Sequence, residues 1–473
     1  MIFYQHKKPF YFLLEVKKHL ILHKILQRMK IIIAGGGEVG SYLAHMLSSE
    51  EQDTYLIDNN PKRLEKAKQN NDILGLNGDA KDIDVLKEAG VKNCDLLIAA
   101  TSSEETNLLI CILGNKLGAK RTICRISNFE EIGNDMLTLY QEIGINHVIS
   151  PVEIAAKEIH QLIKHEAFLD NYDFEEGKLS VFSIQVSENS NMVGNCVLDS
   201  PHFHNNLSFK PIVILRENET IMVQANTEFL VNDIVYFIST PKGYEEIPLI
   251  CGQEDFDIKD VMILGASKIG VLTAERLEGK YNVTLIEKDE EKATYIANQL
   301  QKTLIINGDG TDVSLLENLK IEDMDAFIAV TGDSETNIIA SLVAKSHGVR
   351  KTIAGVENID YIKLSHNIGI DTLINKKVIA ANDILKYIRK GEVNAIATLN
   401  LEAEVIEFTV KAKSKICKRP LKDLKLPPMI NIAGVVRDDI GFIPFGDFQL
   451  EEGDKAIVFT NDETIHKIEK LFQ

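Results

Sequence analysis

Hydrophobic positions in the N-terminal third of the chain alternate between two patterns. The run Met29–Ala34 is short and almost unbroken, as expected of a strand buried on both faces, and it leads directly into a glycine-rich turn. Behind the turn, Val39, Leu43 and Leu47 recur at helical spacing. Residues 96–100 and 122–126 repeat the strand pattern on either side of a helical stretch, 106–117. The alternation predicts a doubly wound parallel sheet.

Much of this pattern returns at a nearly constant step. The glycine turn Gly35–Gly40 is matched by residues 265–270, so that Gly40 corresponds to Gly270 at 270 − 40 = 230. Three further positions repeat at the same step: Asp79 and Asp309, Thr101 and Thr331, Asn107 and Asn337. We therefore interpret the chain as a duplication.

Each copy is followed by a helical stretch and then by a β-rich stretch. The helices are predicted at 152–163 and 377–388. Hairpins are predicted at 211–216 with 221–223 and at 430–436 with 442–443, and both stretches reach a turn, at Asn232-Asp233 and at Gly453-Asp454, before a last strand. The predicted fold class is α/β: two Rossmann-like doubly wound parallel-sheet domains, each followed by a small α+β domain. The expected boundaries are 29–150, 151–250, 259–376 and 377–473, after an extension at 1–28.

The first 28 residues differ from the rest of the chain. They carry six Lys or Arg residues against a single acid, Glu15, with aromatic residues and leucines between them. A secretory signal would need an uncharged apolar core and a small-residue cleavage site, and this segment has neither. A basic amphipathic membrane anchor is one interpretation. We favour the other, in which Met29 is the natural start, because the first predicted strand begins directly after it.

The glycine turn of the first copy has the chemistry of a nucleotide-binding βαβ unit. Gly35 permits the tight turn, Gly37 lets a pyrophosphate approach the backbone, and Gly40 allows close packing of helix and strand. The helix that starts there offers unpaired amides to phosphate. Asp58 ends the second predicted strand, where its carboxylate can accept hydrogen bonds from ribose hydroxyls and repel a 2′-phosphate. We expect no arginine after it to reverse this preference, so NAD or adenosine nucleotides are favoured over NADP.

Other polar residues fall at the ends of the predicted strands of the first copy. Asp79, Thr101 and Arg125 follow three of them, and ligands of open parallel sheets lie beyond the carboxyl ends of the strands. Arg125 is a candidate phosphate-binding or inter-subunit cation. Taken singly, Asp79 and Thr101 could instead cap the helices that follow them, and Asn107 could be a helix-surface amide.

The second copy departs from the pattern at two positions. Ser267 replaces the middle glycine, and its side chain crowds the path of a pyrophosphate, although a single phosphate could still accept a hydrogen bond from its hydroxyl. Gly355 lies near the position of Arg125. Glu287 retains the acid at the end of the second strand. We expect a reduced or altered nucleotide pocket there.

Composition narrows the function classes. A net charge of −18 argues against nucleic acid as a partner, and no stretch approaches twenty uninterrupted apolar residues. The six cysteines show no metal-type spacing, so we expect reduced core or strand residues of a cytosolic protein. His202 and His204 lack partners at ligand spacing, and we expect no metal site. The basic run Lys411–Arg419 is expected to be a solvated strand face, with lipid head groups or a membrane partner as the alternative. No motif of a catalytic nucleophile is present.

The chain resembles the TrkA family of potassium-uptake regulatory proteins, in which two tandem RCK units each join a nucleotide-binding KTN domain to a TrkA-C domain. The resemblance covers residues 29–473. It is most specific in four segments: 29–40, 100–107, 327–331, and the tail from Lys425-Leu-Pro-Pro428 to Gly453-Asp454.

The resemblance implies a non-enzymatic protein that binds NAD(H), ATP and ADP. It also implies a homotetramer that forms a ring of eight units at the cytoplasmic face of the membrane and gates a TrkH-type potassium channel subunit. With the strand-end residues included, the first copy has ten candidate cofactor-binding residues: Gly35, Gly36, Gly37, Glu38, Val39, Gly40, Asp58, Asp79, Thr101 and Arg125. Those of the second copy are Gly265, Ala266, Ser267, Lys268, Ile269, Gly270, Glu287, Asp309 and Thr331. The alternative is an NAD-dependent oxidoreductase, which would need a separate substrate domain with an acid–base residue beside the nicotinamide.

Overall fold

The computed structural model describes residues 28–50, 52–69, 71–127, 134–200, 202–203, 208–217, 219–253, 256–362, 369–389, 392–399, 403–461 and 463–472. Residues 1–27, which make up nearly all of the predicted extension, and His204 of the rejected metal pair lie outside this part. The chain divides after Ser150 into two compact units.

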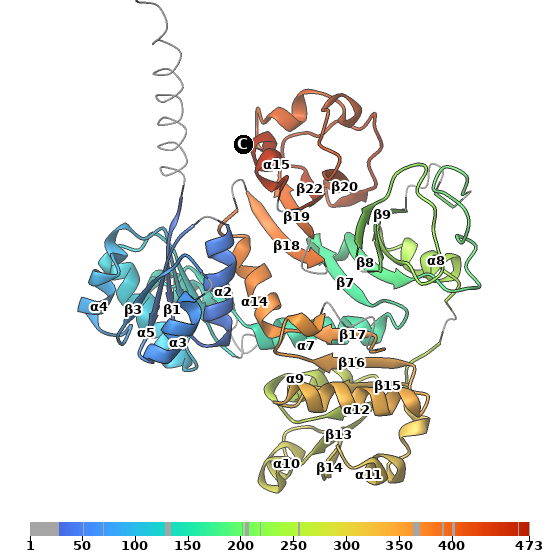
Figure 1. Ribbon diagram of the computed structural model, residues 1–473, viewed down its shortest axis with the longest axis horizontal. Coiled ribbons are helices and arrows are strands. Elements are labelled where there is room, and N and C mark those ends of the chain that lie inside the picture. Colours follow the sequence, from blue (N-terminus) through green and yellow to red (C-terminus); the bar gives the residue numbers. More distant parts are fainter. Residues whose placement is uncertain are drawn as a thin grey trace, which may run out of the picture. The chain divides into compact units, whose positions relative to one another are not determined.

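The first unit contains one six-stranded sheet in the order β3-β2-β1-β4-β5-β6, and all its strand pairs are parallel. Its elements are β1 (Lys30–Ala34), α2 (Glu38–Ser49), β2 (Asp53–Asp58), α3 (Pro61–Lys68), β3 (Leu74–Asn77), α4 (Ile83–Glu88), η1 (Val91–Asn93), β4 (Leu96–Ala99), α5 (Glu104–Leu117), β5 (Thr122–Arg125), α6 (Asn134–Glu142) and β6 (His147–Ile149). The strand order reverses between β1 and β4, which places a crevice at their carboxyl ends. The predicted doubly wound fold is confirmed (Figure 1).

The second unit contains a sheet of the same topology, in the order β14-β13-β12-β15-β16-β17. Its elements are β12 (Asp260–Leu264), α9 (Lys268–Leu277), β13 (Asn282–Glu287), α10 (Glu290–Ala297), β14 (Leu304–Asn307), α11 (Val313–Asn318), η3 (Ile321–Asp323), β15 (Ala326–Ala329), α12 (Ser334–Ser346), β16 (Lys351–Gly355) and β17 (Thr372–Ile374). The predicted duplication of the parallel sheet is therefore present in the fold.

Helix α7 (Pro151–Lys164), which follows the first sheet in sequence, packs on the second sheet's helix α9. Its apolar stripe, including Ala155, Ile159 and Leu162, is fully buried in the same hydrophobic cluster as Ala274 and Leu277. At the edge of this contact the Arg276 guanidinium donates to Glu153 at 2.8 Å. The predicted linker helix thus shares a hydrophobic core with α9 and with one face of the second parallel sheet.

Two small antiparallel modules complete the second unit. The first contains β7 (Asp170–Phe174), η2 (Glu175–Gly177), β8 (Leu179–Gln185), β9 (Phe209–Arg216), β10 (Glu219–Met222), β11 (Ile234–Ser239) and α8 (Gly243–Ile250). The second follows α14 (Lys376–Leu385) and contains β18 (Val393–Leu399), β19 (Ala403–Thr409), η4 (Lys415–Lys418), η5 (Leu421–Asp423), β20 (Asn431–Arg437), β21 (Ile440–Phe442), β22 (Lys455–Thr460) and α15 (Ile465–Phe472). Their strand orders, β10-β9-β11-β8-β7 and β21-β20-β22-β19-β18, are equivalent.

The same ion pair stabilises both modules. Arg216 Nε donates to Asp233 at 2.7 Å in the first, and Arg437 Nε donates to Asp454 at 2.7 Å in the second. Both aspartates are 1 % exposed and come from the two turns predicted before the last strand. Each arginine also reaches the second carboxylate oxygen, so the pairing is bidentate. Within the described residues, no helix is long and apolar enough to cross a membrane.

Candidate nucleotide-binding sites

The glycine turn of the first copy is built as its sequence predicts. Gly35 adopts a φ of +108°, and a Cβ added there would lie 2.9 Å from the Thr101 backbone nitrogen. A Cβ on Gly40 would lie 1.8 Å from the Gly35 carbonyl oxygen, so only glycine allows α2 to start this close to the turn. Space over Gly37 is open, since a Cβ there would meet no atom within 4 Å. Gly37 is also the N-cap of α2, and no side chain caps this helix, so its first amides face that open space.

Asp58 lies at the end of β2 and is 7 % exposed. Its Oδ2 accepts from the Gly36 amide at 2.6 Å, and its Oδ1 accepts from the Asn60 amide at 2.7 Å. The carboxylate therefore fixes the glycine turn as well as facing the crevice. Each oxygen keeps a further lone pair for a ribose hydroxyl.

The expectation that no arginine accompanies Asp58 is wrong. Arg63, in the first turns of α3, places its guanidinium 3.8 Å from Asp58 Oδ2. Arg63 comes five positions after Asp58 in sequence, and the turn between strand and helix brings them together. A cation at this distance weakens the repulsion that a lone carboxylate exerts on a 2′-phosphate. The predicted preference for NAD over NADP therefore loses part of its electrostatic basis.

Asn107 is neither a helix-surface amide nor a residue of the open crevice. It is 1 % exposed, and its Oδ1 accepts from the Thr101 amide at 2.8 Å and from the Thr101 hydroxyl at 2.7 Å. Its Nδ2 donates to the Arg125 carbonyl at 2.9 Å. The buried amide thus joins the ends of β4 and β5. In the second copy Asn337 makes the same bonds to Thr331 and to the Gly355 carbonyl.

The capping alternatives for Asp79 and Thr101 are wrong. Helix α4 is capped by Asp82, and helix α5 by Ser103. Asp79 follows β3 and accepts from the Lys81 amide at 2.9 Å. The sequence pattern did not separate these neighbouring polar residues, because each lies close enough to a helix start to be its cap.

Arg125 ends β5 and is half-buried. Burial lowers the pKa of its guanidinium, while the nearby carboxylates of Glu38 and Glu104 act in the opposite direction. Glu38 begins α2 and Glu104 begins α5, so the charge of Arg125 lies close to the starts of both helices. It is the one cation of the candidate set in the first copy.

The second copy encloses a cleft of about 520 Å³, within the usual range for small-molecule sites. The cleft lies at the carboxyl ends of β12, β13 and β14. Among its lining residues are five of the predicted set: Gly265, Ser267, Glu287, Asp309 and Thr331. The structure therefore brings five of the nine predicted residues together in one concave site, whereas Ala266, Lys268, Ile269 and Gly270 are not among its lining residues.

The Ser267 side chain accepts a hydrogen bond from a helix-start amide, whereas no side chain caps the corresponding helix in the first copy. Ser267 is the N-cap of α9, and its hydroxyl accepts from the Gly270 amide at 3.3 Å. Gly265 and Gly270 otherwise repeat the first turn, with a φ of +98° at Gly265 and no room for a Cβ on Gly270. The two phosphate-facing turns therefore differ mainly in this one side chain.

Two lysines that the sequence did not single out line the second cleft. Lys292 lies 3.1 Å from Glu287 Oε2, at the position that Arg63 holds in the first copy, and Lys288 lies 2.7 Å from Asp309. Burial alone would raise the pKa of Glu287, but bonds from the Asp289 amide, Lys292 and the Ala266 amide outweigh it and lower that pKa. The hydrogen bond from Lys288 is the main cause that lowers the pKa of Asp309 to about 2. Both carboxylates are held in the ionised form.

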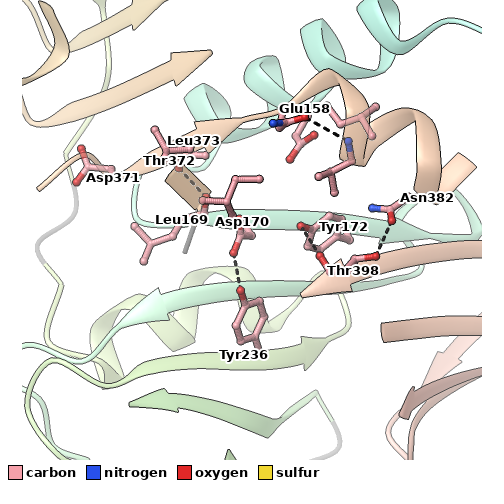
Figure 2. Close-up of a pocket in the computed structure, with 14 residues that line it drawn as sticks. Glu158, Leu169, Asp170, Tyr172, Tyr236, Asp371, Thr372, Leu373, Asn382 and Thr398 are labelled. Carbon is pink, nitrogen blue, oxygen red and sulfur yellow. Dashed lines mark hydrogen bonds between the residues drawn. The ribbon is translucent and has the colours of Figure 1, made fainter. Parts of the chain in front are cut away.

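A second, smaller cavity of about 80 Å³ lies among α7, β7, β11, β17, α14 and β18 (Figure 2). Asp170 faces it and accepts from the Tyr236 hydroxyl at 2.7 Å. Thr398 donates to Asn382 at 2.6 Å on another wall. Burial, and then the charge of Asp170, raise the pKa of Glu158 in this cavity to about 8. Nothing in the sequence pattern predicted this polar cavity, because its walls come from six separate elements.

Cysteines and possible metal ligands add no further site. All six cysteines are free thiols, and Cys94, Cys111, Cys124 and Cys251 are buried, as predicted for core or strand residues. Cys196 and Cys417 are only partly buried and lie outside the strands, which corrects the prediction for these two. In the part of the chain that the structure describes, no three His, Cys, Asp or Glu residues are grouped so as to hold a metal ion.

With the sites in view, comparisons with known proteins define the family. The TrkA-N domain family matches residues 31–151 and 261–376, and the TrkA-C domain family matches 405–473. The chain is 32 % identical over 452 residues to the Trk system potassium uptake protein TrkA of Haemophilus influenzae, covering 94 % of this chain and 99 % of that protein. It is 31 % identical over 457 residues to TrkA homolog 1 of Methanosarcina mazei, covering 94 % of this chain and 100 % of that protein. The chain belongs to the TrkA family of Trk system potassium uptake proteins.

Solved structures support the fold. The GsuK RCK domain aligns with a TM-score of 0.59 at 17 % identity, covering 94 % of this chain and 95 % of that chain. The GsuK channel bound to NAD aligns with the same TM-score and identity, and the alignment covers 94 % of this chain and 79 % of that chain. The tandem RCK architecture is thus shared with a channel whose RCK units share little sequence with this chain.

Proposed function

We propose that the protein is a nucleotide-binding regulatory subunit of a Trk-type potassium uptake system. The observation that carries the proposal is the duplicated crevice. In each copy an acid at the end of the second strand accepts from the glycine-turn amide, at 2.6 Å in Asp58 and 2.9 Å in Glu287. Two such crevices in a chain of the TrkA family point to sensing rather than chemistry.

The proposed ligands are NAD(H), ADP and ATP. In the first copy the open space over Gly37 and the uncapped start of α2 suit a pyrophosphate, with Asp58 for a ribose and Arg125 for phosphate charge. The GsuK channel, which shares this fold, has been solved bound to NAD, and this supports the assignment by analogy of fold. In the second copy the Ser267 hydroxyl competes for the Gly270 amide, which favours ligands that place less phosphate on the turn.

Regulation then follows from unequal binding to two conformations. A nucleotide can shift an equilibrium only by its difference in affinity for the two states, typically about 1–3 kcal/mol. We propose that this difference opens or closes a membrane potassium channel subunit of the TrkH type. The regulatory chain would act from the cytoplasmic face and would not itself contact the ion.

The proposed assembly is a homotetramer whose eight parallel-sheet units form a ring. Support comes from three positions at which both copies expose an apolar side chain, each repeated after 230 residues. The pairs are Leu74 and Leu304, Ile83 and Val313, and Leu109 and Ile339. Leu74 and Leu304 lie on the edge strands β3 and β14, Ile83 and Val313 on the helices α4 and α11 that follow them, and Leu109 and Ile339 on α5 and α12. Exposed apolar residues kept at equivalent places in two diverged copies indicate a contact surface.

The test is reconstitution. The chain would be co-purified with the membrane potassium channel subunits of the same cell, and potassium flux would be measured in vesicles with ATP, ADP and NADH added in turn. Flux that depends on both the protein and a nucleotide supports the proposal. Flux indifferent to both removes the regulatory function, and a hydride-transfer assay with candidate substrates would then test the oxidoreductase alternative.

A further inference from the structure

A concentrated positive charge lies on the second antiparallel module. Between residues 411 and 425 the chain carries seven cations against one acid, Asp423, whereas the whole chain has a net charge of −18. All seven side chains are exposed. We call them the basic face: Lys411, Lys413, Lys415, Lys418, Arg419, Lys422 and Lys425.

Most of this charge is unbalanced. Lys411 lies 3.9 Å from Glu392, and Lys422 pairs with Asp447. In the part of the chain that the structure describes, the other five cations pair with no carboxylate. Neighbouring surface cations repel one another, so these five contribute no ion pair to the fold.

The loop that carries the basic face is nevertheless firmly anchored. It follows β19 and includes η4, which corrects the prediction of a strand face for this run. Ser414 and Ile416 are buried, at 1 % and 0 % exposed, and the Ser414 hydroxyl donates to the Lys411 carbonyl at 2.9 Å. Lys413 adopts a φ of +66°, a conformation in which glycine or asparagine would be less strained. The alternation of buried anchors and exposed cations holds the charges outward.

The first module contains the same loop without the charge. Residues 188–199 repeat the burial pattern of 412–423, with Ser190 and Met192 as the buried anchors in place of Ser414 and Ile416. The Ser190 amide donates to the Ser187 carbonyl at 3.1 Å, as the Ser414 amide donates to the Lys411 carbonyl at 3.2 Å. Yet the exposed positions hold Asn189, Asn191, Gly194 and Asn195 where the second module has Lys413, Lys415, Lys418 and Arg419. The loop therefore needs its anchors and does not need the cations.

We propose that the basic face docks on anionic lipid head groups at the membrane surface. Clusters of four to eight Lys or Arg residues have this affinity, since each cation near an anionic leaflet contributes about fivefold to binding. The choice of a membrane rests on the proposed function, which places the chain beside an integral-membrane subunit. Docking there would hold the second module close to the channel.

The composition of the basic face favours lipid over other polyanions. Six of the seven cations are lysines, which act as mobile point charges, whereas specific carboxylate recognition and protein interfaces favour arginine. Residues 411–428 include no aromatic side chain on which a nucleic-acid base could stack. Binding to the phosphate groups of a lipid surface requires neither arginine nor a stacking aromatic side chain.

The test is co-sedimentation of the full chain with lipid vesicles, without channel subunit or nucleotide. Vesicles of phosphatidylcholine mixed with phosphatidylglycerol are compared with vesicles of phosphatidylcholine alone. The variant combines Lys413→Asn, Lys415→Asn, Lys418→Gln and Arg419→Asn, three of which adopt the first module's residues. The matched control removes four exposed lysines elsewhere: Lys116→Asn, Lys157→Asn, Lys242→Asn and Lys302→Asn. Thermal melting checks both folds, and Lys413→Asn with Lys415→Asn is the smaller alternative.

We expect the unmodified chain and the control to bind the anionic vesicles in a salt-sensitive manner. The basic-face variant should lose at least about tenfold of that binding, given about fivefold per cation. Equal binding to both vesicle types, or equal binding by variant and control, overturns the proposal. A further outcome is that the chain fails to bind anionic vesicles while the variant loses binding to the detergent-solubilised channel subunit or to RNA. That outcome would overturn the lipid proposal and identify that partner as the ligand of the basic face. Since the vesicle assay contains no channel, its failure leaves the proposed function standing.

Discussion

A single carboxylate at the end of the second strand serves both the fold and the candidate ligand. Asp58 accepts two backbone amides, one from Gly36 and one from Asn60, before any ribose arrives. Glu287, whose side chain is one methylene longer, accepts hydrogen bonds from the equivalent amides of Ala266 and Asp289. Because these bonds define the turn, the acid fixes the position of the phosphate-facing amides as well as offering its own free lone pairs.

Replacing Asp58 by Ala should weaken NAD and ATP binding to the first copy by about 1–3 kcal/mol, the range for hydrogen bonds to a charged group. Calorimetry of each nucleotide measures this. Asp53→Ala, at the exposed start of the same strand, is the matched control and should bind as the unmodified chain does. Unchanged affinity in Asp58→Ala would count decisively against the first site.

Ser267→Gly should strengthen dinucleotide binding in the second copy, because it frees the Gly270 amide and the space above the turn. Ser267→Ala separates the two causes, since it removes the hydroxyl but keeps the Cβ. Loss of the N-cap should cost about 1 kcal/mol of stability in Ser267→Ala and only a few tenths in Ser267→Gly. Binding is followed in an Asp58→Ala background, and no gain in Ser267→Gly would mean that the second pocket is closed for another reason.

The sequence predicts residues whose role depends on local backbone geometry. Gly35 and Gly40 were assigned correctly, because a tight turn and a close approach leave a recognisable spacing. Arg63 and Asn107 were not, since their roles depend on which atoms the folded chain brings beside them. An arginine five positions after an acid, or an asparagine in the first turns of a helix, has no signature in one sequence. Comparing the copies offered a signal, because Asn337 repeats Asn107 and Lys292 repeats the charge of Arg63.

At the scale of elements, periodicity located most helices and strands and failed where packing decides. The predicted helix at 152–163 is observed as Pro151–Lys164, and the hairpins form in both modules. The basic run was assigned to a strand because alternating lysines resemble a half-exposed strand. It forms a turn and a 3-10 helix instead, because Ser414 and Ile416 are drawn into the core beneath it. The sequence pattern does not predict the bidentate pairs of Arg216 and Arg437, since each aspartate is 17 residues away in sequence and is brought close only by the pairing of neighbouring strands.

The cavity of Figure 2 predicts a pH dependence of stability. The pKa of Glu158 is raised to about 8, against about 4.3 in an unfolded chain, by burial and by Asp170. Between these values the folded state holds one more proton than the unfolded state, so stability falls as pH rises, by up to about 1.4 kcal/mol per pH unit. Asp170, Tyr172, Tyr236 and Asp371 line the cavity with it, and among the lining residues that the structure describes there is no lysine or arginine.

Glu158→Gln removes this titration and keeps a similar shape. Its stability relative to the unmodified chain should therefore increase steadily from about pH 5 to about pH 8. Denaturant unfolding at several pH values measures the difference. Glu291→Gln, at an exposed position of α10, should show no such trend. Parallel pH profiles for Glu158→Gln and the unmodified chain would show that Glu158 ionises normally.

At the scale of the whole molecule, duplication makes one half an internal control for the other. Features shared by both copies, such as the buried asparagine and the bidentate arginine, are requirements of the fold. Features present in one copy only, such as Ser267, Arg125 and the basic face, mark where the two halves have separate tasks. The exposed apolar positions belong to the shared group, yet they contribute nothing to the core of either sheet. The proposed ring would account for these shared positions, because both copies would use them to contact further chains.

Leu109 and Ile339 allow this to be tested without disturbing the core, since they are 42 % and 62 % exposed on equivalent helices, α5 and α12. The double variant Leu109→Glu with Ile339→Glu places a charge at each contact, and an unpaired charge in an interface opposes association. Light scattering should show a tetramer for the unmodified chain and a smaller species for the double variant at the same concentration. Leu249→Glu, which changes a side chain that is 64 % exposed on α8, should assemble as the unmodified chain does. A monomer at every concentration for the unmodified chain would rule out the ring, and a tetramer of unchanged stability in the double variant would move the contact to another surface.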